Sequence, residues 1–129
     1  MSTKPKLLVV DNEIDIGNFV KSFFEVRGFE VMAVLNGDEA MKALDEMKPD
    51  LVSLDVMMRH EKEGLEYLPQ IKKKMPNVRV IMVTGVDDKD TVEECKKMGA
   101  DDYITKPLVL YYLESTLVDK VKHLSPATS

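Results

Sequence analysis

The stretch that decides the fold is Pro49–Asp55, which reads PDLVSLD. An apolar run that is too short for a helix and follows turn-forming residues indicates a buried strand. Parallel sheets bury both faces of their strands and bind ligands beyond the carboxyl ends. Asp55 stands at that end, where a carboxylate on a rigid strand suits a nucleophile or a metal ligand. An ordinary turn residue after a strand would look the same, so the rest of the chain has to decide.

Four more short runs have the character of strands, and segments with apolar residues at helical spacing separate them. The runs are residues 6–11, 29–34, 78–84 and 102–107. Asn36 and Glu39 stand at capping-box spacing and predict a helix start. Pro69 cannot donate to the Leu65 carbonyl, so the helix around it should start late or kink. Strand and helix alternate five times, which predicts an α/β domain with a parallel sheet.

Length and composition limit the class of protein. A chain of 129 residues suits one domain with a real core. The formal charge of −5 argues against direct nucleic-acid binding, which needs a basic face. We expect no signal peptide and no membrane span, because no apolar stretch is long enough. The single cysteine, Cys95, forms no disulfide within the chain and fits a reducing cytoplasm.

Polar residues end four of the five expected strands and should meet at one edge of the sheet. They are Asp11 with Asn12 beside it, Asp55, Thr84 and Lys106. Each has a structural explanation by itself: Asp11 as a helix N-cap, Thr84 as a strand residue, Lys106 as a loop charge. Together they suit phosphoryl transfer, which needs oxygen ligands for a hard cation, a carboxylate nucleophile, and a hydroxyl and an ammonium for the phosphoryl oxygens.

With these residues at the strand ends, the sequence resembles the receiver domain of two-component response regulators. The matching motifs, in chain order, are LLVVDNE at 7–13, LDVMM at 54–58, VTG at 83–85 and GADDYITKP at 99–107. The resemblance extends from about Lys6 to Leu124. It implies a flavodoxin-like (βα)5 fold, with a doubly wound parallel five-stranded sheet in the order 2-1-3-4-5. Residues 1–124 would be the receiver domain, and residues 125–129 a polar tail or the start of a linker.

The resemblance also implies a Mg²⁺ site. Asp55 would be the phosphoacceptor and one of the metal ligands. Asp11 and Asn12 occupy the positions of the family's acidic pair, and the Met57 backbone carbonyl is the remaining expected ligand.

The family's switch residues can be carried over in the same way. Thr84 and Lys106 would contact the phosphoryl group, and Tyr103 falls on the aromatic that changes rotamer on activation. The peptide bond between Lys106 and Pro107 would be cis, an isomer that only proline adopts at modest cost.

The partners implied are a histidine kinase or a histidine phosphotransfer protein as phosphodonor. Phosphorylation would change a face formed by the fourth helix, the fifth strand and the fifth helix. A second copy of the chain or an effector domain would bind that face. No turnover of an external substrate is expected.

Three departures from the family pattern keep other interpretations open. Asn12 replaces an acid, the loop Arg59–Glu63 is charged and one residue longer than usual, and Val109 replaces the acid that commonly opens the last helix. One alternative is a receiver-like interaction domain that does not use phosphate. The other is an aspartyl-phosphate hydrolase of the haloacid dehalogenase type, although that class needs an acid where this chain has Met57.

Overall fold

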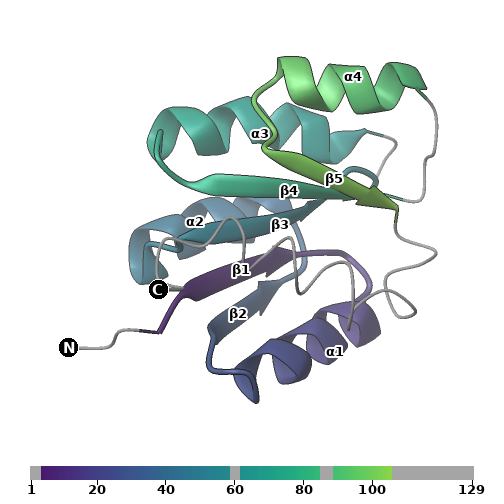
Figure 1. The fold of residues 1–129 in the computed structure, drawn as a ribbon. Coiled ribbons are helices and arrows are strands. Elements are labelled where there is room, and N and C mark those ends of the chain that lie inside the picture. Colours follow the sequence, from purple (N-terminus) through teal and green to yellow (C-terminus); the bar gives the residue numbers. More distant parts are fainter. Residues whose placement is uncertain (1–3, 59–61, 85–88, 106–129) are drawn as a thin grey trace.

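The structure is a computed structural model that describes residues 4–58, 62–84 and 89–105 (Figure 1). Within these ranges strands and helices alternate strictly. The elements are β1 Lys6–Val10, α1 Ile14–Glu25, β2 Glu30–Val34, α2 Gly37–Met47, β3 Leu51–Asp55, α3 Glu63–Lys74, β4 Arg79–Thr84, α4 Lys89–Lys97 and β5 Asp102–Thr105. The sequence also predicts a last helix over residues 110–124, with an apolar stripe of Leu110, Leu113, Leu117, Val121 and Leu124. This helix lies outside the described residues.

All five strands are parallel and stand in the order β2-β1-β3-β4-β5, as predicted. The chain starts in the middle of the sheet, forms β2 on one side, and then crosses β1 to build β3, β4 and β5 on the other (Figure 1). The carboxyl ends of β1 and β3 are therefore neighbours at the point where the winding direction reverses. Open α/β sheets bind ligands at such a switch point.

The sheet separates two apolar clusters, because side chains alternate across a strand. Leu7 and Val9 of β1 belong to the cluster on the α1 side, together with Phe24 of α1. Leu8 and Val10 belong to the cluster on the other side, which α2, α3 and α4 cover. Both faces of the central strands are thus buried, which explains why their sequences are continuously apolar.

Helix α2 begins as its sequence predicts. The Asn36 side-chain oxygen accepts a hydrogen bond from the Glu39 N–H at 2.9 Å. The Glu39 carboxylate in turn accepts one from the Leu35 N–H at 2.9 Å, one residue further out than in the usual capping box.

Helix α3 does not start late, so that alternative for Pro69 was wrong. The helix begins at Glu63, and Pro69 lies inside it. Leu65, Leu68 and Ile71 on its inner face are buried. Tertiary packing of that face supports the helix on both sides of the proline, although the Leu65 carbonyl loses its donor there.

Candidate functional site

Two buried carboxylates lie side by side at the carboxyl edge of the sheet. Val10 of β1 is in register with Leu54 of β3, so Asp11 and Asp55 each follow a paired residue on neighbouring strands. Asp11 is 3% exposed and Asp55 is 1% exposed. A buried carboxylate is costly unless hydrogen bonds or a cation compensate for the lost water. This pair is the main feature of the site.

Each carboxylate has one oxygen fixed by the backbone two residues later. Asp11 Oδ1 accepts from the Glu13 N–H at 2.8 Å, and Asp55 Oδ1 accepts from the Met57 N–H at 3.2 Å. The N-cap of α1 is Glu13, which is exposed. Asp11 is therefore not the N-cap, and its side chain closes the turn that leads from β1 toward α1.

Asn12 connects this turn to the segment that follows Asp55. Its side-chain nitrogen donates to the Met58 carbonyl oxygen at 3.0 Å. Met58 is buried, whereas the Met57 side chain is 42% exposed. The sequence placed Asn12 and Met57 in the site but did not predict the bond to Met58.

Helix α3 closes one side of the site through Gly64, another residue that sequence reasoning missed. A Cβ on Gly64 would overlap the Asp55 carbonyl oxygen and come within 2.8 Å of Val56 Cα. The Gly64 N–H donates to the Val56 carbonyl at 2.7 Å. The available signal was the glycine itself, since glycine often marks a close approach between two backbones.

The sequence predicts a charged loop over Arg59–Glu63, and the structure shows that this prediction is wrong for Glu63. Glu63 is the first residue of α3 and is only 2% exposed, because the close approach of Gly64 to Asp55 draws the start of the helix inward. Lys62 has a left-handed backbone and pairs with Glu94 of α4, Nζ to carboxylate oxygen, at 3.3 Å. Residues 59–61 lie outside the described residues.

The backbone of Thr84 reaches the same edge as Asp55. Asp55 is in register with Val83 of β4, and Thr84, the next residue, is paired with Thr105 of β5. The Thr84 side chain is outside the described part of the structure. So are Lys106 and Pro107, including the peptide bond between them that was expected to be cis.

Tyr103 lies on β5 in register with Met82. It is half-buried and packs against the cluster on the side of α2, α3 and α4, whereas Ile104 faces the α1 side. Tyr103 therefore lies on the face of the sheet that α4 covers.

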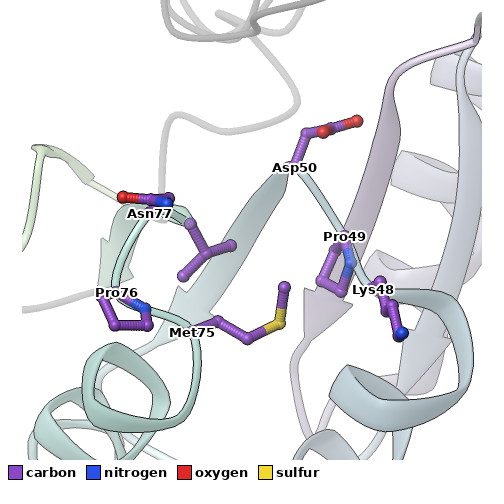
Figure 2. A pocket seen from close by; sticks show the side chains of 7 residues that line it. Lys48, Pro49, Asp50, Met75, Pro76 and Asn77 are labelled. Carbon is purple, nitrogen blue, oxygen red and sulfur yellow. The ribbon is translucent and has the colours of Figure 1, made fainter.

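One cleft among the described residues lies away from this edge. It measures about 270 Å³ and is lined by Lys48, Pro49, Asp50, Met75, Pro76, Asn77 and Val78. Figure 2 shows these side chains around the connections that precede β3 and β4. The cleft therefore lies at the amino edge of the sheet, opposite the edge where Asp55 ends β3.

The donors present at the carboxyl edge suit a small hard cation. Within the described ranges no three His, Cys, Asp or Glu side chains cluster as metal ligands. The expected set instead combines the two carboxylates of Asp11 and Asp55 with the amide of Asn12 and the Met57 carbonyl. Mg²⁺ takes oxygen ligands of these kinds and keeps several waters, so the residues fit it.

Comparison with known proteins establishes the family. The response regulator receiver domain matches residues 7–118. The chain belongs to this family, and it is a receiver domain of the two-component response regulator type.

Three relatives illustrate the match. "Chemotaxis protein CheY" of Listeria monocytogenes is 43% identical over 103 residues, which is 79% of this chain and 86% of that protein. A two-component response regulator from Clostridium difficile has a TM-score of 0.83 at 25% identity, covering 94% of this chain and 95% of that one. Response regulator TrrA of Thermotoga maritima, solved in complex with Mg²⁺-BeF, has a TM-score of 0.79 at 31% identity, covering 93% and 98%.

No helix of the described residues combines the length and the apolar character that crossing a membrane would require.

Proposed function

We propose that Asp55 accepts a single phosphoryl group and that this modification switches partner binding. The observation that carries the proposal is the buried pair of Asp11 and Asp55 at the switch point of the sheet in a receiver-domain chain. A carboxylate oxygen of Asp55 attacks phosphorus, the bond from phosphorus to the donor's leaving atom breaks, and an acyl phosphate forms. The donor is the phosphohistidine of a histidine kinase or phosphotransfer protein, or a small acyl phosphate.

The residues around Asp55 have distinct roles in this proposal. Asp11, Asn12, Asp55 and the Met57 carbonyl hold Mg²⁺, which when bound neutralises charge on the phosphoryl oxygens. The Met57 N–H fixes one Asp55 oxygen at 3.2 Å and so orients the carboxylate. Thr84 and Lys106 bind the phosphoryl oxygens, since the protein's part in phosphoryl transfer is mostly positioning and charge.

The switch follows from the added charge of roughly −1.5 to −2. Thr84 moves toward the phosphoryl group, and the Tyr103 side chain then changes its rotamer. This biases a surface made of α4, β5 and the predicted last helix, which binds a second copy or an effector domain. We expect this regulation to operate in the cytoplasm, without turnover of an external substrate.

The test is the intact mass of the protein after incubation with acetyl phosphate and Mg²⁺. We expect one phosphoryl group on the wild type, lost in acid or base, and none when Mg²⁺ is omitted. Asp55→Ala should remain unmodified. Asp50→Ala is the matched control, because Asp50 precedes the same strand at the opposite edge and should leave the modification intact. Wild-type levels of modification in Asp55→Ala would refute the assignment.

A further inference from the structure

Asn12 uses an amide N–H donor, which an ionised aspartate does not have. Its Nδ2 lies 3.0 Å from the carbonyl oxygen of Met58, a residue 46 positions further along the chain. A carbonyl oxygen only accepts hydrogen bonds, so the amide nitrogen must be the atom that faces it. This bond does not use the Asn12 Oδ1, which is the atom expected to serve as a neutral ligand.

An ionised aspartate at position 12 could not make this contact. Both of its oxygens are acceptors, and one would face the Met58 carbonyl oxygen at hydrogen-bond distance without a proton between them. It would also add a third negative charge beside the buried carboxylates of Asp11 and Asp55. Close carboxylates repel one another, and a divalent cation relieves that repulsion.

The bond from Asn12 completes the fixation of the turn after Asp55. Val56 is held on both sides: its N–H donates to the Val83 carbonyl at 3.0 Å, and its carbonyl accepts from Gly64 at 2.7 Å. The Met57 N–H is held by Asp55. At the far end, the Met58 side chain lies in the core and its carbonyl is held by Asn12. The Met57 carbonyl, an expected cation ligand, lies between these fixed points.

We propose that Asn12 is a positioning residue whose amide N–H fastens the turn after β1 to the turn after β3, so that the acidic pocket is assembled before any divalent cation binds. The role of the pocket as a Mg²⁺ site rests on the function proposed above. The bond itself acts in the metal-free protein and can be tested there.

The experiment is hydrogen–deuterium exchange of the backbone amides of residues 56–58 and 62–65, with and without Mg²⁺. The wild type should exchange alike in both conditions. Asn12→Leu keeps the approximate shape of the side chain but has no hydrogen-bond donor. In this variant the same backbone amides should exchange roughly three- to tenfold faster, with and without Mg²⁺, which is the scale of one lost hydrogen bond. Asn12→Asp should exchange faster without metal and return to the wild-type rate with Mg²⁺.

A matched control and a separate metal titration keep the outcomes distinct. Asn18→Asp adds the same charge on an exposed position of α1 and should leave these amides unchanged. Equal metal-free exchange in the wild type and Asn12→Leu, or a wild type that needs Mg²⁺ for protection, would overturn the proposal. If calorimetry instead shows no Mg²⁺ binding and acetyl phosphate leaves Asp55 unmodified, the proposed function fails while the metal-free comparison still tests the role of Asn12.

Discussion

At the scale of single residues, Gly64 is required by space. Its Cα lies so close to the Asp55 carbonyl that any Cβ would overlap backbone atoms, and backbone atoms cannot rotate away as a flexible side chain can. The start of α3 and the turn after Asp55 therefore share one tight contact. Any side chain at position 64 has to move one of them.

We predict that Gly64→Ala lowers the free energy of unfolding by about 1–3 kcal/mol, the usual cost of overpacking. Urea denaturation measures it. Gly17→Ala is the matched control, because its Cβ would lie 3.6 Å from Ala33 Cβ, an ordinary contact. That change should raise stability by about 0.5–1 kcal/mol, since alanine suits a helix better than glycine. Similar effects at the two sites would contradict this account.

Lys48 is a non-glycine residue in a backbone conformation that favours glycine. It ends α2 with φ 48° and ψ 67° in the left-handed region, directly before Pro49. A side chain in that region costs free energy that glycine avoids, and glycine is the usual residue at this point of a helix end.

We predict that Lys48→Gly raises the free energy of unfolding by about 0.5–1 kcal/mol. The same substitution at Lys42, an exposed position inside α2, should lower it by about 1 kcal/mol. Thermal melts of the two variants compare them directly. If both changes destabilise, the left-handed strain at Lys48 is negligible.

At the scale of elements, Asp101 joins three of them. Its Oδ2 accepts from the Val80 N–H of β4 at 2.8 Å and from Lys72 Nζ of α3 at 2.9 Å, just before β5 begins. Lys72 also donates to the Val78 carbonyl at 2.8 Å. Unlike an ion pair between exposed side chains, this carboxylate satisfies a backbone donor in a partly buried position.

We predict that Asp101→Ala lowers the free energy of unfolding by about 1–3 kcal/mol, because it leaves the Val80 N–H without its acceptor. Asp45→Ala is the control: Asp45 pairs with Lys74 at 2.9 Å, but its side chain is 69% exposed. Loss of such a surface pair changes stability by about 0–1 kcal/mol. Chemical denaturation that showed equal losses would mean that Asp101 contributes only a surface charge.

At the scale of the whole molecule, the two faces of the sheet are covered by different numbers of helices among the described residues. Helices α2, α3 and α4 pack on one face, and α1 packs on the other over β1 and β2. Ile81, Val83 and Ile104 also point to the α1 face, further along the sheet. The apolar stripe predicted for residues 110–124 would suit this area. The last helix, and with it the domain bounds 1–124, remains a prediction.

The predicted last helix also carries Tyr111, Tyr112 and Val118 away from that stripe, on the proposed output surface. Aromatic side chains outside a core favour interfaces. We predict that phosphorylation strengthens self-association through this surface and that Tyr112→Glu abolishes the increase. Sedimentation velocity with and without phosphodonor measures it, and Asn18→Glu on α1 controls for the added charge. Identical sedimentation of the wild type and Tyr112→Glu in both states would remove the support for this surface.

The sequence by itself determined the alternation of strands and helices and the acids at the strand ends. Both are readable because periodicity and turn residues act over a few positions, and because parallel strands place their carboxyl ends at one edge. The bounds of α3 were not readable in this way. The local effect of Pro69 was outweighed by packing of a buried face against the sheet.

The details of the pocket were decided only by the tertiary structure. The bond from Asn12 to Met58, the burial of Glu63 and the contact of Gly64 with Asp55 each depend on how a segment lies against another element. The separation of residues 12 and 58 in the sequence does not predict a hydrogen bond between the Asn12 amide and the Met58 carbonyl. That contact follows from the register of β1 on β3 and from the burial of Met58, which arise only when the sheet and its helices pack together.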